Sequence, residues 1–162
     1  MPERIVAFPP VAPPGARLLI LGSMPSAASL AEGFYYGHPR NAFWRILSDV
    51  YAAPLPRTVP EKRALLEAHG VALWDVLHSC VREGSLDSAI RDMEVNDFSS
   101  LLARCPRVER VLLNGGTAKR VFLKYVAQAL GDRAWVALPS TSPAYTLSYE
   151  RKLAQWRQAL TL

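Results

Sequence analysis

Short apolar runs alternate with amphipathic segments along most of the chain. The apolar runs predict buried parallel strands, and apolar residues at helical spacing predict helices that pack against them. The predicted strands are 17–21, 71–76, 108–113 and 134–138. The predicted helices are 41–51, 60–70, 97–102, 117–130 and 149–160, the third capped by Asn96 or Asp97. Strands separated by helices indicate a parallel sheet with helices on both faces, joined by right-handed crossovers.

The ends of the chain and its overall composition add little beyond this α/β pattern. Residues 1–16 contain five prolines and little periodicity, which predicts an irregular N-terminal arm. At 162 residues, half of them hydrophobic and 20% charged, the chain is expected to form a single domain over 1–162. There is neither an apolar run of the roughly 18–20 residues that a membrane span needs nor a secretory signal. We therefore expect a cytoplasmic monomer without membrane contacts.

The net charge and the spacing of the cysteines and histidines bear on which partners and cofactors the chain could bind. The formal net charge is +5, and most of the 19 basic residues are arginines, which suit bidentate phosphate contacts. This excess permits a nucleic-acid partner, although an arginine-rich proteome would produce the same count. The two cysteines, Cys80 and Cys105, and the three histidines, His38, His69 and His78, show no metal-ligand spacing. We expect neither a metal nor another cofactor.

The loop after the first predicted strand carries the densest candidate chemistry. It begins Gly22-Ser23-Met24-Pro25-Ser26 and continues through three aromatics to His38-Pro39-Arg40-Asn41. Loops that carry aromatic and hydrogen-bonding side chains usually bind a ligand, and open α/β sheets bind ligands where their strands end. The segments 77–87, 114–117 and 139–145 follow the other three strands, so all four should converge at one edge. This convergence is the basis of the active-site hypothesis.

The aromatic residues of the first loop divide into two groups. Phe34, Tyr35 and Tyr36 lie among glycines, where at least one ring should be a platform on which a ligand stacks. Phe43 and Trp44 begin the helical pattern, which favours a packing role for both.

Several of the polar candidates have a simpler structural interpretation. His38 taken alone suits a hydrogen-bonded structural histidine, and Asn41 suits a cap for the helix that follows it. The segment 114–117 lacks the lysine of a P-loop and the spacing of a dinucleotide fingerprint, which favours a tight turn. In 139–144, two prolines fix the backbone while three hydroxyls face a phosphate or a base edge, although a plain rigid loop is the alternative.

Taken together, the motifs resemble the hypoxanthine (deoxyinosine) DNA glycosylases, a branch of the uracil-DNA glycosylase superfamily. The matching segments are Gly-Ser-Met-Pro-Ser at 22–26, Tyr-Tyr-Gly-His-Pro-Arg-Asn-Ala-Phe-Trp at 35–44, Trp-Asp-Val at 74–76, Gly-Ser-Leu-Asp-Ser at 84–88, Asn-Gly at 114–115 and Pro-Ser-Thr-Ser-Pro-Ala at 139–144. The resemblance extends from about residue 17 to 156. It implies a three-layer α/β/α sandwich around a four-stranded parallel sheet. It also implies a monofunctional enzyme of base-excision repair that hydrolyses the N-glycosidic bond of a deaminated base, hypoxanthine first, with uracil and xanthine as further candidates.

The resemblance assigns the catalytic residues. In the superfamily the first motif activates water, but Met24 stands where the best-known branch has an aspartate, and methionine cannot deprotonate water. The polar residue offered by the deoxyinosine branch is Asn41, which would position water, since an amide is no base at neutral pH. Backbone amides at Ser23 and Met24 would stabilise the departing base. The catalytic set is therefore Asn41, Ser23 and Met24.

The same resemblance predicts the residues that hold the base. This substrate-binding set is Gly22, Phe34, Tyr36, His38, Asp75 and Ser140. Asp75 lies where the uracil branch has an asparagine that recognises uracil, although it could instead cap the loop or pair with Arg82. Ser140 stands where that branch has a histidine that stabilises the departing base.

The last motif is expected to bind the DNA. In the superfamily this motif grips phosphates and precedes a side chain that is inserted into the duplex. The predicted DNA-binding residues are Ser140, Thr141, Ser142, Pro143, Ala144 and Tyr145. Tyr145 is the predicted wedge, with Leu147 as its substitute, and its alternative role is to pack under the final helix.

Two other function classes stay open at this stage. A hydrolase of free nucleosides or nucleotides is disfavoured because the loops carry no cluster of carboxylates. A nucleic-acid-binding module without catalysis is kept open by Met24, which replaces the usual aspartate.

Overall fold

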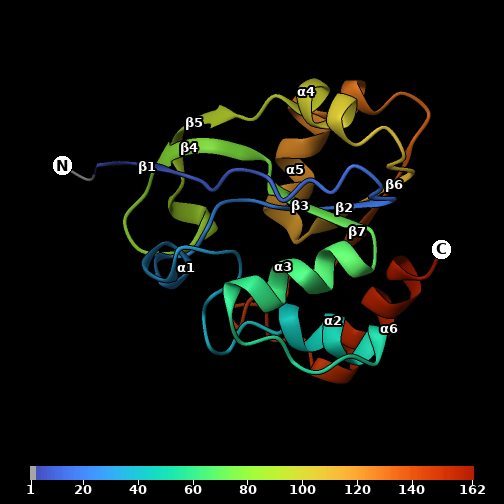
Figure 1. Cartoon of the computed structure of the whole chain (residues 1–162). Coiled ribbons are helices and arrows are strands. Elements are labelled where there is room, and N and C mark those ends of the chain that lie inside the picture. The colour runs from blue at the N-terminus through green and yellow to red at the C-terminus, as the bar shows by residue number, and fades with distance from the viewer. Residues whose placement is uncertain (1–2) are drawn as a thin grey trace.

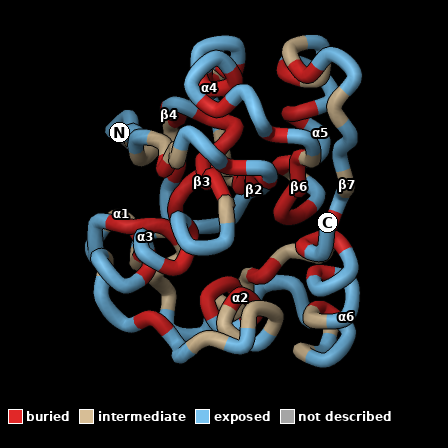
Figure 2. Tube along the Cα trace, turned by 45° about the vertical axis from the view of Figure 1, so that its right-hand side comes forward, coloured by how far each residue is buried: buried red, intermediate tan, exposed pale blue. Residues whose placement is uncertain are grey.

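The central sheet has four parallel strands in the order β3-β2-β6-β7. In the computed structural model, which describes residues 3–162, these strands are Leu18–Gly22 (β2), Val71–Asp75 (β3), Arg110–Asn114 (β6) and Ala134–Leu138 (β7). Strands β2 and β3 are buried along their whole length, and β6 along all but its first residue. Figure 2 shows these buried strands at the centre and β7 exposed at the edge. Burial on both faces explains why the strands appear in the sequence as continuous apolar runs.

Helices cover both faces of this sheet (Figure 1). Helices α2 (Phe43–Tyr51), α3 (Val59–Ala68) and α6 (Tyr149–Leu160) lie on one face. Helices α4 (Phe98–Arg104) and α5 (Gly116–Tyr125) lie on the other. The arrangement confirms the predicted three-layer α/β/α sandwich. Within residues 3–162, none of the helices is long and apolar enough to cross a membrane.

Local sequence signals explain most helix ends. Thr58 caps α3 by accepting a hydrogen bond from the Glu61 backbone N–H, and Ser148 caps α6 in the same way. Asp97, not Asn96, caps α4. The side chain of Asn96 instead donates to the backbone carbonyls of Asp75 and Leu77, at 2.8 and 3.1 Å. One predicted helix is too long, because α5 ends at Tyr125 and is followed by a 3₁₀ turn (η2) over Ala127–Leu130.

A second sheet was not predicted from the sequence. It is antiparallel, with the order β1-β4-β5, and consists of Arg4–Val6 (β1), Leu77–Val81 (β4) and Arg91–Val95 (β5). Residues 3–16 are therefore not a wholly irregular arm, since β1 pairs with β4 and Val11 exchanges backbone hydrogen bonds with Leu73. Strands β1 and β5 are mostly exposed, so they lack the apolar run from which a strand could be predicted.

Two short helices near the carboxyl edge of the main sheet were also missed. Helix α1 (Ala27–Glu32) is capped by Ser26 and ends at Gly33, whose φ is 80°. The 3₁₀ helix η1 (Asp87–Ala89) lies between β4 and β5. Both helices are too short to show a helical period in the sequence.

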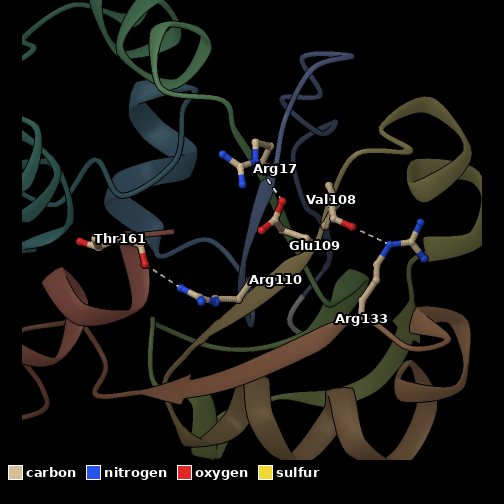
Figure 3. A network of polar contacts seen from close by, with 6 residues as sticks. All are labelled: Arg17, Val108, Glu109, Arg110, Arg133 and Thr161. Atoms are coloured by element: carbon tan, nitrogen blue, oxygen red, sulfur yellow. Dashed lines mark hydrogen bonds and ion pairs between the residues drawn. The ribbon is translucent and has the colours of Figure 1, made fainter.

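Some of the arginines stabilise the amino-terminal edge of the main sheet (Figure 3). Arg17, before β2, forms an ion pair with Glu109, before β6, at 2.9 Å. Arg110 donates to the Thr161 carbonyl at 3.0 Å, and Arg133, before β7, donates to the Val108 carbonyl at 2.7 Å. These arginines lie away from the carboxyl ends of the strands. Part of the basic excess therefore supports the fold and is not available for phosphates.

Trp156 connects α6 to the loop that follows β7. Its ring is fully buried against Phe43, with ring centroids 6.1 Å apart, and its indole N–H donates to the Pro139 carbonyl at 3.0 Å. The contact fixes the start of the 139–145 loop relative to α6.

We expect Trp156→Phe to destabilise the protein by about 1–3 kcal/mol, because the partly buried Pro139 carbonyl loses its donor and the smaller ring leaves a void. Urea denaturation of wild type and variant measures this difference. Trp135→Phe, at an exposed position on β7, is the control and should change stability by less than about 0.5 kcal/mol. Equal effects of the two substitutions would contradict the structural role of Trp156.

Candidate active site

A cavity of about 270 Å³ lies where the four parallel strands end. Its walls come from segments that follow each strand, as the sequence predicted: 22–26 after β2, Asp75 at the end of β3, Asn114 at the end of β6, and 140–142 after β7. Ser85, Leu86 and Asp87 complete the wall from the side of the second sheet. None of the residues that line this cavity is a lysine, arginine or histidine.

A larger groove of about 890 Å³ adjoins the cavity. The two share Tyr36, Asn41, Thr141 and Tyr145 as lining residues. Five cationic side chains line the groove against one acidic side chain, Glu32; the cationic ones are Arg40, Arg45, Arg57, Lys62 and Lys152. The structure therefore places a neutral-to-acidic cavity beside a cationic groove.

Gly22 makes room for two side chains at the bottom of the cavity. A Cβ atom at Gly22 would lie 2.6 Å from Asp75 Oδ1 and 2.8 Å from the Tyr36 hydroxyl oxygen. These distances are shorter than real Cβ contacts, so only glycine at the end of β2 permits this arrangement. Gly22 thus has a definite role in shaping the predicted binding site.

Asp75 is the only carboxylate at the carboxyl end of the four central strands. The residue is 3% exposed, and its Oδ2 is buried with no hydrogen-bond partner within residues 3–162. Burial raises the pKa of this carboxyl to about 7, and the negative charge of Asp87 acts in the same direction, while Arg82 lowers it. An ionisable group in a cleft with so displaced a pKa is a candidate for function.

The alternative in which Asp75 pairs with Arg82 is not what the structure shows. The Arg82 guanidinium donates from Nε to the Gly84 carbonyl at 3.0 Å and from another nitrogen to the Pro25 carbonyl. Its remaining nitrogen is buried without a partner, and no ion pair with Asp75 forms among residues 3–162. Arg82 therefore holds the loop backbone, and Asp75 is left facing the cavity.

Tyr36 lines the cavity, together with Tyr35 and Tyr145, whereas Phe34 does not. The Tyr36 ring stacks on Phe43 with centroids 4.1 Å apart and planes at 22°. Burial and the nearby Asp75 raise the pKa of the Tyr36 hydroxyl, so it is neutral. Phe34 is 3% exposed, stacks on Trp44 and lines neither the cavity nor the groove. The prediction that Phe34 binds the substrate is wrong, because its side chain belongs to the hydrophobic core.

Asn41 lies where the cavity meets the groove. Its Oδ1 accepts a hydrogen bond from the backbone N–H of Phe43, the first residue of α2, at 3.0 Å. The side chain thus supports the turn into the helix, although the N-cap residue is Ala42 and not Asn41, and it also lines the cavity. Its NH₂ group forms no hydrogen bond within the part of the chain that the structure describes.

His38 lies outside the smaller cavity. It lines only the groove, and its Nδ1 accepts from the Arg40 backbone N–H at 3.1 Å while its carbonyl accepts from the Asn41 N–H at 2.9 Å. The predicted contact of His38 with the base is therefore not supported by its position. The residue stabilises the turn that orients Asn41.

Ser23 and Met24 form the wall that follows β2. The Ser23 hydroxyl donates to Asp87 Oδ1 at 2.8 Å, which connects this wall to η1. Met24 is buried in the core and presents only part of its side chain to the cavity. Neither side chain is a base, and the role of their backbone amides stays a prediction.

Asn114 and Thr141 form a reciprocal pair that sequence reasoning missed. The Asn114 NH₂ donates to Thr141 Oγ1 and its Oδ1 accepts from the Thr141 N–H, both at 3.0 Å. The Thr141 carbonyl accepts from Ala42 N–H, so Thr141 also holds the segment before α2. A polar residue at the end of an otherwise apolar strand was the available signal. Thr141 is 1% exposed and is committed to these bonds, so the predicted phosphate contact of its side chain is not supported.

The rest of the last motif forms an exposed tip above the cavity. Ser140 Oγ accepts from Ser142 N–H at 3.1 Å, Ser142 Oγ accepts from Ala144 N–H at 3.2 Å, and Lys152 Nζ donates to the Ser142 carbonyl at 3.0 Å. Pro143 and Ala144 are exposed.

Tyr145 and Leu147, the two candidate wedges, differ in exposure. Tyr145 is 49% exposed, with Lys152 Nζ 5.6 Å from the ring centroid, and it is not packed into the core beneath α6. Leu147 is only partly exposed and lines the groove.

No group of three or more His, Cys, Asp or Glu side chains within residues 3–162 is arranged to hold a metal ion. Cys80 and Cys105 are both buried as free thiols.

Comparison with known proteins identifies the family of this chain. Residues 9–161 match the model of the uracil DNA glycosylase superfamily. The chain is 35% identical to the hypoxanthine DNA glycosylase of Methanosarcina barkeri over 153 residues, covering 94% of this chain and 95% of that protein. It is also 35% identical to the hypoxanthine DNA glycosylase of Methanosarcina acetivorans, covering 92% and 93%.

The fold is shared as well. The solution NMR structure of a candidate uracil DNA glycosylase from Methanosarcina acetivorans superposes with a TM-score of 0.84 at 32% identity, covering 98% of this chain and 97% of that one. The chain therefore belongs to the uracil DNA glycosylase superfamily, in the branch of the hypoxanthine DNA glycosylases that its motifs resemble.

Proposed function

We propose that this protein is a monofunctional DNA glycosylase that hydrolyses the N-glycosidic bond of a deaminated base, with hypoxanthine as its first substrate. It acts in base-excision repair as a cytoplasmic monomer, without a metal or other cofactor. The observation that carries the proposal is the cavity of about 270 Å³ at the carboxyl edge of the sheet, lined by Asp75, Tyr36 and Asn41 and adjoining a cationic groove. The two similar Methanosarcina proteins that are named hypoxanthine DNA glycosylases support the choice of base.

In this proposal the damaged base leaves the duplex and enters the cavity. A base inside a duplex must be flipped out at a cost of a few kcal/mol before an enzyme can act on it. The Tyr36 ring, supported from behind by Phe43, offers a face on which the base stacks. Asp75 at the bottom of the cavity contacts the edge of the base.

Hydrolysis then requires a positioned water and a stabilised leaving group. Cleavage passes through an oxocarbenium-like sugar, and the base departs with negative charge. Asn41 lies at the mouth of the cavity, where the sugar of a flipped nucleotide would be, and its amide positions the water. Backbone amides of Ser23 and Met24 and the Ser140 hydroxyl are neutral donors near the base.

The groove and the last motif hold the DNA. The exposed guanidinium groups of Arg40 and Arg57 line the groove and suit phosphate oxygens. The tip from the partly exposed Ser142 to the exposed Ala144 offers hydroxyl and backbone groups to phosphates, and such contacts position the DNA without sequence preference. Tyr145 at this tip fills the space that the flipped base leaves.

The cationic groove separates this proposal from the hydrolysis of free nucleosides. A free nucleoside carries no phosphate, so the groove would have no ligand. A nucleic-acid-binding module without catalysis would bind the same DNA as the proposed glycosylase but would release no base. An assay of base release distinguishes the two.

The proposed activity predicts base release from DNA duplexes that contain hypoxanthine. Incubation with duplexes carrying hypoxanthine, uracil or xanthine, followed by alkaline cleavage of abasic sites, should produce strand breaks that persist in the presence of EDTA. Binding of these duplexes without any breaks would favour the module, and release of base from free deoxyinosine alone would favour the nucleoside hydrolase. Activity that is lost in EDTA and restored by zinc would contradict the metal-free proposal.

Asn41→Ala should lower the single-turnover rate about 10²-fold or more, as expected for a positioned catalytic group, with little change in DNA binding. Asn41→Ser is the matched variant, because serine can still accept the hydrogen bond from Phe43 N–H. We expect the serine variant to retain thermal stability but to lose turnover nearly as severely. If Asn41→Ser turned over at the wild-type rate, the role of Asn41 would be only to support the start of α2.

Tyr145→Ala should lower base release from paired duplex at least about tenfold more than from single strands, where no stack has to be opened. The ratio of single-turnover rates on the two substrates measures this effect. Tyr125→Ala is the control, since Tyr125 is 54% exposed at the end of α5 and lines neither the cavity nor the groove. An equal loss on both substrates would argue against the wedge.

A further inference from the structure

We propose that Asp75 contacts the flipped base as a neutral carboxylic acid and donates a hydrogen bond to the carbonyl oxygen of the base as it departs. Asp75 is then the catalytic group that stabilises the leaving base, a role beyond recognition of its edge. The inference rests on the proposed function and defines the substrate class as bases whose leaving anion places charge on a carbonyl oxygen.

The composition of the cavity creates the need for such a donor. The leaving base takes up negative charge, yet the lining residues include no lysine, arginine or histidine. The nearest arginine, Arg82, is occupied by the Gly84 and Pro25 carbonyls. Stabilisation of the anion must therefore come from neutral donors within the cavity.

The position of Asp75 suits this role. Oδ1 and the Tyr36 hydroxyl both flank the point where a Gly22 Cβ would be, at 2.6 and 2.8 Å. Oδ2 is buried and has no hydrogen-bond partner among the described residues. The Tyr36 hydroxyl oxygen is also buried without a partner among these residues. Oδ2 is thus one of two unpaired polar atoms in this part of the cavity, and a base that enters is the partner that it lacks.

The surroundings of Asp75 favour its protonated form. Its pKa is raised to about 7, mainly by burial and also by the Asp87 carboxylate on η1, and Arg82 after β4 only partly offsets both. Tyr36, from the loop before α2, lies beside it as a neutral hydroxyl because burial raises the pKa of that group. The Tyr35 hydroxyl is neutral for the same reason and donates to the Pro9 carbonyl at 2.8 Å. A bound base excludes more water and brings an electron-rich oxygen close, and both effects favour the proton on Asp75.

The chemistry balances with Asp75 as a hydrogen-bond donor. The bond between C1′ and N9 breaks, and its electron pair stays on the base. The water oxygen forms the new bond to C1′. The proton lost by water balances the proton that the base takes up on release, so Asp75 keeps its own. An ionised Asp75 would repel the same anion across a water-poor cavity, which is why the neutral form is required.

The test compares wild type, Asp75→Asn and Asp87→Asn in single-turnover release of hypoxanthine from duplex DNA. The wild-type rate should fall about thirtyfold between about pH 6 and about pH 8.5, since each pH unit above the pKa lowers the neutral fraction about tenfold. In Asp75→Asn the fall should disappear, because an amide donor does not titrate. In Asp87→Asn the fall should move to lower pH, since a neighbouring negative charge is gone. A flat wild-type profile, or the same fall in Asp75→Asn, overturns the inference.

Thermal unfolding supplies a measurement that does not depend on activity. A carboxyl whose pKa is raised from 3.8 to about 7 binds a proton in the folded state more readily than in the unfolded state. Its contribution to stability is therefore lost as the pH rises from about 4 to about 7. The Tm of Asp75→Asn should rise relative to wild type across this range and stay constant above it. A Tm difference that does not change with pH overturns the neutral form.

The two measurements separate failure of the inference from failure of the proposed function. Wild-type protein that releases no base at any pH overturns both the glycosylase proposal and the role of Asp75 toward a base. Wild-type protein that releases hypoxanthine with the same pH profile as Asp75→Asn overturns only the role of Asp75.

Discussion

The site depends on the register between β2 and its neighbours. Gly22 and Asp75 are partners in the parallel pairing of β2 with β3, at the last position of both strands. A shift of one residue would turn Asp75 to the opposite face and bring a side chain into the space beside it. The register is held by the apolar residues of β2, which are buried on both faces of the sheet. Close packing of the core thus determines where Asp75, the carboxylate at the end of β3, lies in the cavity.

The loops above the sheet are held by a few buried polar contacts. The pair formed by Asn114 and Thr141 joins the end of β6 to the loop after β7, and the Thr141 carbonyl extends the connection to Ala42. Trp156 and Lys152 of α6 hold the Pro139 and Ser142 carbonyls of the same loop. These contacts satisfy buried backbone groups and keep the cavity wall rigid. Only the tip of the loop is left exposed.

Charge is distributed so that binding and chemistry take place in different environments. Three of the five cationic side chains of the groove, those of Arg40, Arg45 and Arg57, are exposed and favour a phosphate backbone, whereas the cavity beside the groove has no cationic side chain. A cation in the cavity would lower the pKa of Asp75 and favour its ionised form. The negative charge of that form would repel the departing base. At the opposite edge of the sheet, Arg17, Arg110 and Arg133 hold the strands and helices in place (Figure 3). The basic composition therefore serves both the fold and the proposed DNA contact.

The sequence by itself determined the four parallel strands, most of the helices, the family and the four loops of the site, because these depend on apolar runs, caps and motifs that are local in the chain. Only the tertiary structure decided that Tyr36 and not Phe34 lines the cavity, that Arg82 leaves Asp75 unpaired, and that Asn114 binds Thr141. It also decided the antiparallel sheet of β1, β4 and β5, whose exposed strands exist through pairing with distant segments. Such contacts join residues far apart in the chain, and local periodicity contains no information about them.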